Sequence, residues 1–187
     1  MDTIVQKFCI FVITLCLGFP AFANAETKTY KLRQCPFHIS LPSKPLVSYE
    51  CAEQVPEKCV SFMEFTKVHI GQATIEITIR CAPSKKEDYE RFSAMELKAS
   101  LEENAKVSGI EQIRSHTNKN NETKVKYATL TGLRPSSHNH LEAVIMNRAW
   151  ITPDYLVSFQ ASLSGKSSKE VDEEFSRIIQ SAQLETE

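Results

Sequence analysis

Four cysteines carry the clearest chemistry in this chain. They are Cys35, Cys51, Cys59 and Cys81. An even number of cysteines in an oxidising compartment is typical of a disulfide framework. Zinc binding is the competing interpretation, but the chain has no C-x-x-C motif and no Cys/His pair at zinc-finger spacing. The sequence therefore favours two disulfides over a metal site.

Strand patterning selects one pairing of these cysteines. Cys35 belongs to the apolar side of an alternating segment that continues to residue 41, and Cys81 ends a second alternating segment, residues 74–81. Cys51 and Cys59 flank a polar segment that reads as a loop and would close a small ring. We therefore predict the disulfides Cys35–Cys81 and Cys51–Cys59, each worth about 2–4 kcal/mol.

Two histidines are spaced for metal binding. His138 and His140 would point the same way on a strand and could both bind Zn²⁺ or Cu²⁺. Two imidazoles make an incomplete site, and a polar connection between strands explains them without metal. The two histidines are a candidate metal pair, and no cofactor is predicted.

Catalytic motifs are missing from the chain. There is no G-x-S-x-G turn for a serine hydrolase. The segment 164–167 resembles the end of a phosphate-binding loop, but the first glycine of that motif would fall on Gln160. The adjacent carboxylates Glu102-Glu103 and Glu173-Glu174 diverge on helices and are expected on the solvated surface. The sequence predicts no catalytic residue and no enzyme.

The first 25 residues have the layout of a secretory signal peptide. A short polar segment ends at Lys7, an apolar run covers residues 8–17, and Ala23-Asn24-Ala25 forms a small-x-small cleavage site. The apolar run is shorter than the roughly 20 residues that span a bilayer. A lipoprotein is disfavoured because bulky Leu15 precedes Cys16. We expect residues 1–25 to be a signal peptide and residues 26–187 to be one exported domain.

Composition excludes several classes of protein. The 187 residues are 42% hydrophobic and 24% charged, which is ordinary for a globular domain. The formal net charge of −1 gives no electrostatic footprint for nucleic acid or for an anionic membrane surface. No second long apolar stretch follows the expected signal peptide, so no stable membrane insertion is expected after its cleavage.

The chain alternates strand patterns with two helix patterns. Strands are expected at residues 29–32, 37–41, 59–68 and 72–81, then at 111–116, 123–132, 141–152 and 155–163. One helix is expected from a capping box at residues 84–87 to Gly109, and another from a capping box at residues 167–170. Segment 141–152 is apolar on both sides, as in a strand with both faces covered. The prediction is a single α+β domain, an antiparallel sheet covered by helices on its faces.

The first helix carries more apolar surface than one sheet can bury. One stripe contains Leu97 and Leu101, and a second, roughly opposite, contains Phe92 and Met95 with Tyr89 beside it. The second stripe is covered by the N-terminal segment or by the 42–58 loop, or it binds a protein partner. Tyr89, Phe92 and Met95 are the candidate partner-binding residues.

The element order resembles the PsbP-like fold. The fold is shared by the photosystem II extrinsic protein, a Ran-binding nuclear import factor and bacterial DcrB-like periplasmic proteins. The resemblance runs through segments 37–42, 127–132 and 175–181, the mid-chain helix and Ala149-Trp150. The four cysteines are not part of that pattern. The resemblance implies a fold whose members mostly bind partners and are seldom enzymes, and it transfers no site residue.

Together these features predict a non-catalytic binding or accessory protein of the bacterial periplasm, with an extracellular location as the alternative. Its partner would be an unidentified protein of the cell envelope. An inhibitor or immunity protein for an exported toxin belongs to the same class. The alternative from another class is a hydrolase whose site is too dispersed to recognise.

Overall fold

The strands and helices follow the α+β order that the sequence pattern predicts. The structure, a computed structural model, describes residues 27–33, 35–52, 55–71, 73–135, 142–166 and 168–185. The strands are β1 (Lys28–Lys31), β2 (Phe37–Leu41), β3 (Leu46–Ala52), β4 (Val55–Val68), β5 (Ala73–Pro83), β6 (Glu111–Asn120), β7 (Val125–Arg134), β8 (Ala143–Ile151), β9 (Tyr155–Gly165) and β10 (Gln183–Leu184). The helices are α1 (Lys86–Arg91), α2 (Ala94–Val107) and α3 (Lys169–Ser181).

Seven of the strands form one antiparallel sheet in the order β3-β4-β5-β9-β8-β7-β6. Alternation builds its centre, because Ile75, Ile77 and Ile79 of β5 are buried while Glu76 and Thr78 between them are exposed. A separate three-stranded sheet has the order β1-β2-β10. The α+β class and the single domain are confirmed.

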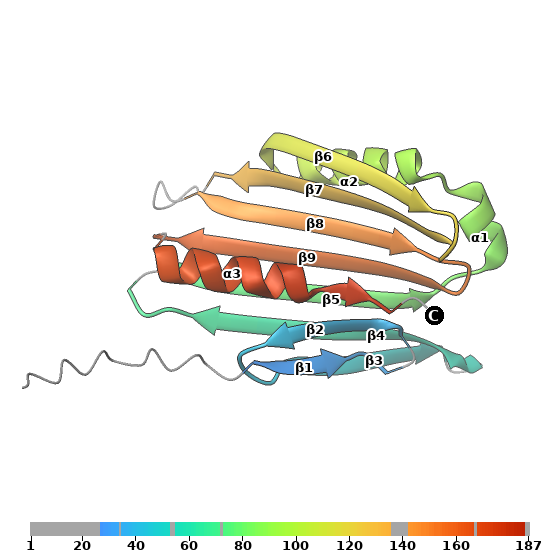
Figure 1. Cartoon of the computed structure of the whole chain (residues 1–187), viewed down its shortest axis with the longest axis horizontal. Coiled ribbons are helices and arrows are strands. Elements are labelled where there is room, and N and C mark those ends of the chain that lie inside the picture. Colours follow the sequence, from blue (N-terminus) through green and yellow to red (C-terminus); the bar gives the residue numbers. More distant parts are fainter. Residues whose placement is uncertain are drawn as a thin grey trace, which may run out of the picture.

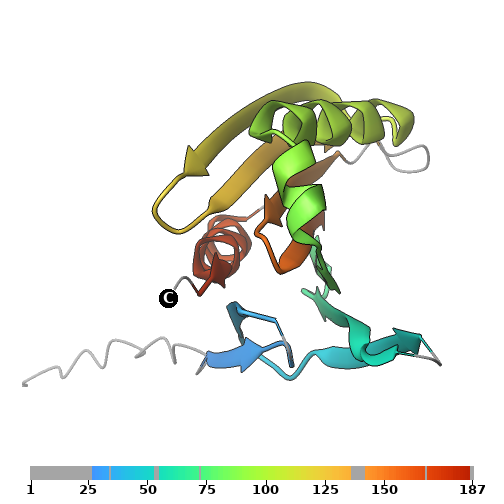
Figure 2. The same ribbon diagram turned by 90° about the vertical axis from the view of Figure 1, so that its right-hand side faces the viewer.

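The helices cover opposite halves of the large sheet, on opposite faces. On one face α2 packs on β6, β7 and β8, where Ala105 is in one cluster with Leu130 and Ile145, and Leu97 is in another with Ala128 and Ile151. On the opposite face α3 and the small sheet pack on the other half, with Phe175 in one core with Phe159. Figure 1 shows α3 and β2 in front of β4, β5 and β9, with α2 behind the remaining strands. Each face is therefore covered over one half only, as the turned view in Figure 2 also shows.

The first predicted helix is interrupted, and its predicted start is wrong. The cap residue of α1 is Lys85, which makes no side-chain cap hydrogen bond, and not Ser84. The capping box lies at the start of α2, where the amide of Glu96 donates to Ser93 Oγ at 3.1 Å and the amide of Ser93 donates to Glu96 Oε2 at 2.6 Å. These hydrogen bonds lower the pKa of Glu96.

The helix end was predicted better than its start. α2 ends at Val107, and Gly109 adopts a left-handed φ of 69°. The amide of Ile110 donates to the carbonyl of Ala105 at 2.9 Å, and that of Gly109 to Lys106 at 3.1 Å. This is the Schellman arrangement, in which a glycine reverses the chain and satisfies the last carbonyls.

Two further expectations need correction. The predicted 42–58 loop contains β3, which pairs with β4 so that Cys51 lies opposite Cys59. The alternation of β3 was hard to detect because Leu46 and Tyr49 are exposed rather than buried. In α3 the cap is Ser168, whose hydroxyl accepts from the amide of Val171 at 3.4 Å, and residue 167 of the predicted capping box lies outside the described residues.

Two disulfides join the strands. Cys35, just before β2, is bonded to the buried Cys81 of β5 with a Cα–Cα distance of 6.4 Å. Cys51 of β3 is bonded to Cys59 of β4 with a Cα–Cα distance of 4.0 Å. These are the two pairs that strand patterning predicts. The first ties the small sheet to the large one, and the second closes the hairpin at its edge.

The two disulfides should differ in their contribution to stability. Cys35–Cys81 spans 46 residues and Cys51–Cys59 only 8. Loop-closure entropy assigns them about 4 and about 2.5 kcal/mol. In urea unfolding we expect Cys35→Ala/Cys81→Ala to lose more stability than Cys51→Ala/Cys59→Ala. The opposite ranking would mean that the link between the two sheets does not stabilise the fold.

Candidate functional site

The predicted partner-binding residues lie at the bend between α1 and α2. Phe92 is the residue that ends α1, and Met95 lies in the first turn of α2. Phe92 is 38% exposed and Met95 is 64% exposed. Tyr89 differs from them, because it packs against a buried cluster that contains Leu97 and Ile151. We call Phe92 and Met95 the elbow surface, and Tyr89 is not part of it.

A buried lysine holds this bend in place. Lys126 of β7 is 7% exposed, and its Nζ lies 3.9 Å from the centroid of the Tyr89 ring. The same ammonium donates to the carbonyl of Tyr89 and, at 2.8 Å, to the carbonyl of Phe92. Burial, together with repulsion from Lys119, lowers the pKa of Lys126. The bend is therefore fixed to the sheet through main-chain contacts that leave the Phe92 and Met95 side chains outside.

The 42–58 segment does not cover the elbow surface in the part of it that the structure describes. It forms β3 and the start of β4, at the edge of the sheet opposite to β6, whereas α2 packs on β6, β7 and β8. Val107, at the far end of α2, is 85% exposed. The N-terminal 26 residues lie outside the described chain.

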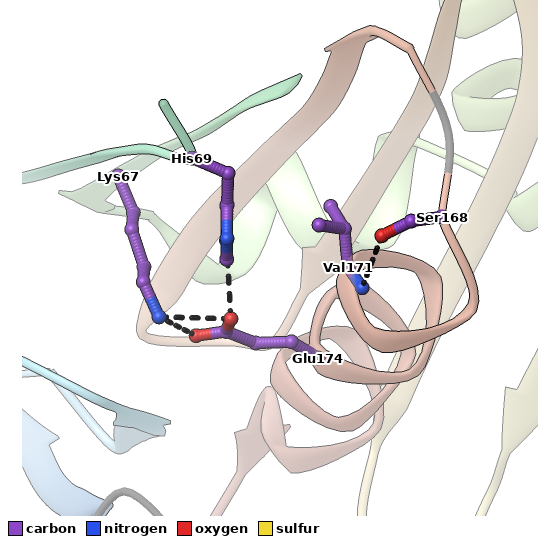
Figure 3. Close-up of polar contacts among 5 residues, drawn as sticks. All are labelled: Lys67, His69, Ser168, Val171 and Glu174. Atoms are coloured by element: carbon purple, nitrogen blue, oxygen red, sulfur yellow. Dashed lines mark hydrogen bonds and ion pairs between the residues drawn. The ribbon is translucent and has the colours of Figure 1, made fainter. Parts of the chain in front are cut away.

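A second cluster gathers around a buried carboxylate of α3 (Figure 3). The Lys67 ammonium donates to both oxygens of Glu174, at 2.7 and 2.8 Å. His69 Nε2 lies 3.1 Å from Glu174 Oε2 but is not aligned as a hydrogen bond. Glu174 was expected on the solvated surface with Glu173, and that expectation is wrong for Glu174. Because Lys67 engages both of its oxygens, the carboxylate fastens α3 to the β4–β5 hairpin and is unsuited to act as a general base.

Glu102, His38 and His116 also contact neighbouring side chains. Lys98 and Ser115 donate to Glu102, and these bonds lower the pKa of that carboxyl. His38 Nδ1 lies 3.5 Å from Glu185, and the His116 ring meets Tyr127 edge-on. No group of three metal-ligating side chains occurs among the described residues. His138 and His140 lie outside them, so the metal pair stays a prediction.

A polar hollow marks the uncovered half of the face that carries α2. Its volume is about 340 Å³. The polar side chains lining it come from β4, β5, β7 and β9 and are Glu64, Thr66, Glu76, Thr78, Arg134, Gln160 and Ser162. The Ser162 hydroxyl donates to Glu76 at 3.1 Å. The hollow is therefore lined by two acids and one arginine, and its one serine is hydrogen-bonded to one of those acids.

Sequence reasoning missed three charged residues that organise these regions, Lys126, Arg148 and Glu174. Lys126 and Glu174 carried a signal. Lys126 occupies the inward side of an alternating strand, two residues before the buried Ala128. Glu174 falls within the apolar stripe of α3, beside Phe175 and three residues after Val171. A charge at a position that the periodicity assigns to the core indicates a buried polar contact. Arg148 of β8 gave no such signal, because Thr129 of β7, to which its Nε donates at 3.1 Å, lies opposite it only through strand register.

No family model and no curated protein matches this chain. Among solved structures, the Ran-binding protein Mog1p of Saccharomyces cerevisiae is similar in fold, with 11% sequence identity and a TM-score of 0.40. The match covers 86% of this chain and 96% of Mog1p. The PsbP-like fold stays a prediction. None of the helices in the described chain is long and apolar enough to cross a membrane.

The Glu174 contact predicts a stability difference between neighbouring acids. Glu174→Gln should lower the free energy of unfolding by about 1–3 kcal/mol, because it removes the charge that two ammonium hydrogen bonds use. The matched control is Glu173→Gln on the exposed side of α3, 3.9 Å from Lys169, which should stay within about 0.5 kcal/mol. Urea unfolding measures both. Equal effects would show that the cluster does not fasten the helix.

Proposed function

We propose that this protein is a non-catalytic binding protein of the bacterial envelope that contacts a protein partner through its elbow surface. The observation that carries the proposal is that Phe92 and Met95 are held outward at a bend fixed by the buried Lys126. A flexible apolar side chain can fold back on the protein, but this bend is anchored through its main chain. Large apolar side chains presented in this way are typical anchors of protein interfaces.

Export is the second part of the proposal. Two disulfides in a small domain suit an oxidising compartment. The signal-like segment at residues 1–25 is the route by which the chain would reach it. The periplasm is the location that we propose, with the extracellular space as the alternative.

The binding role also agrees with the state of the polar groups. Among the described residues, the carboxylates that are best placed to do chemistry are already engaged, Glu174 by Lys67 and Glu102 by Lys98 and Ser115. A general base or nucleophile needs a free lone pair directed at substrate. These groups instead hold helices to the sheet.

The elbow surface predicts a loss of binding without a matching loss of fold. Phe92→Ser/Met95→Ser should weaken the complex with the envelope partner by more than about 1 kcal/mol, as truncated interface anchors do. Met95→Ser alone should leave the free energy of unfolding within about 0.5 kcal/mol, because its side chain is mostly exposed. The partner captured by the wild-type protein is titrated against each variant by calorimetry.

Val107→Ser is the matched control, on the same helix but distant from the bend. It should not change the affinity. If Val107→Ser weakens the complex as much as the two variants of the elbow surface do, or if no variant weakens it, the elbow surface is not the contact. A large drop of the thermal midpoint in Met95→Ser would instead place that residue in the core.

Export predicts a defined N-terminus. Protein recovered from the periplasm of a bacterial host should begin at Glu26, since cleavage follows Ala25. Intact mass spectrometry of the non-reduced protein measures the cleavage and the loss of four thiol hydrogens together. A mass that retains residues 1–25, or four free thiols, would contradict the proposal.

A further inference from the structure

The uncovered half of the sheet face that carries α3 presents a cluster of polar and cationic side chains. Figure 1 looks onto this face: α3 lies across the neighbouring strands, and α2 lies behind β6, β7 and β8. Register brings His116, Thr129 and Arg148 into one row across these three strands, with Arg114 and Tyr127 in the adjoining rows. We call these five residues the open front surface.

Arg148 is fixed at the centre of the open front surface. Its guanidinium carbon lies 5.2 Å from the centroid of the Trp150 ring, and its Nε donates to Thr129 Oγ1 at 3.1 Å. Trp150 is buried and packs edge-on against Phe37 and Phe159, so the ring that supports the arginine cannot move freely. The guanidinium of Arg148 is therefore held in one orientation in the free protein.

The terminal nitrogens of Arg148 are unused within the described chain. Arg148 forms no ion pair with a described residue, and its one hydrogen bond there uses Nε. The side chain is half-buried, and this burial lowers its pKa. A partly desolvated guanidinium is normally paired with a carboxylate. The two terminal NH2 groups that remain can each donate one N–H to one oxygen of a carboxylate.

The charged side chains nearest to Arg148 on this side of the sheet are basic. The cationic or protonatable neighbours on the same side of the sheet are Arg114 and His116. Among the described residues on this side of β6, β7 and β8, the one acid is Glu111, which pairs with Leu133 at the start of β6, one row beyond that of Arg114. The protein as a whole has a net charge of only −1, so the positive charge is a local feature of this face.

We infer that the open front surface binds an acidic protein segment, with an Asp or Glu carboxylate bound end-on by Arg148. Thr129 orients the arginine, and Arg114 and His116 add attraction for further acids. The inference rests on the proposed function only in taking the ligand to be a protein. It adds a contact on the face of the sheet opposite to α2, so the two surfaces can fail independently.

The test is an NMR titration of the purified, oxidised protein with the peptide acetyl-Gly-Glu-Gly-Asp-Gly-amide and its Gln/Asn counterpart. We expect the acidic peptide to shift the Arg148 Nε–Hε signal and the backbone amides of residues 127–129. The neutral peptide should not do so. Arg148→Gln should weaken acidic-peptide binding about tenfold, the scale of a charged hydrogen bond. Arg148→Lys, which keeps the charge but not the planar guanidinium, should recover only part of the affinity.

Arg80→Gln is the matched control. Arg80 also lies on a strand, with its guanidinium carbon 6.0 Å from the centroid of the Phe62 ring, but on the opposite face of the sheet. The Arg80→Gln variant should bind the acidic peptide as tightly as the wild-type protein does. Three results would overturn the inference: equal weakening in Arg80→Gln, equal binding of the neutral peptide, or tighter binding of inorganic phosphate than of the acidic peptide. Loss of binding in Arg148→Gln alone, with Phe92→Ser/Met95→Ser unaffected, supports this surface separately from the elbow surface.

Discussion

The pairing of β5 with β9 is the interaction on which the rest of the structure depends. Each strand has 11 residues, and the ladder runs without interruption from Ala73 opposite Gly165 to Pro83 opposite Tyr155. It joins β3, β4 and β5 to the four strands that follow the helices α1 and α2. The same ladder aligns the apolar sides of both strands, so Ile75, Ile77 and Phe159 form one surface on which α3 and the small sheet pack.

One consequence of this long sheet is that the helices cannot cover it. A helix is about 10 Å wide, whereas seven strands spaced by about 4.8 Å make a far wider surface. The chain places α2 over one end of one face and α3 with the small sheet over the other end of the opposite face. The two halves left open carry the open front surface on one face and the polar hollow on the other. The two proposed contacts are the bend between α1 and α2 and the open front surface.

Much of this arrangement could be predicted from residue patterns. Alternation of apolar residues predicts β2, β5 and β9, and it places Cys35 and Cys81 on the core side, which determines their pairing. The excess apolar surface of the first predicted helix identifies Phe92 and Met95, and both side chains are exposed. Tyr89 was grouped with them, although it packs toward Ile151. The sequence of a helix shows which of its faces is apolar. How deeply a side chain on that face is buried depends on the strand that packs against it.

The residues that sequence reasoning missed depend on contacts across the chain. Ser84 and Ser93 both begin a Ser-x-x-Glu motif. The second is used because Lys126, on a later strand, binds the carbonyls at the bend. Arg148 looks like an ordinary strand residue until register places Thr129 opposite it. Glu174 needs Lys67 from a strand far away in sequence. Such pairs depend on sheet order, which local periodicity does not determine.

The central claim is that the bend between α1 and α2 is exposed while the core beneath α3 is covered. The rate of methionine oxidation by dilute peroxide tests this claim most directly. Met95 is 64% exposed, Met146 is half-buried, and Met63 is 1% exposed. Peptide mass spectrometry of the native protein should find Met95 oxidised first, Met146 next and Met63 protected until unfolding. Protection of Met95 to the level of Met63 would show that the outer side of α2 is covered, and it would contradict the account of this protein as one that binds through an open bend.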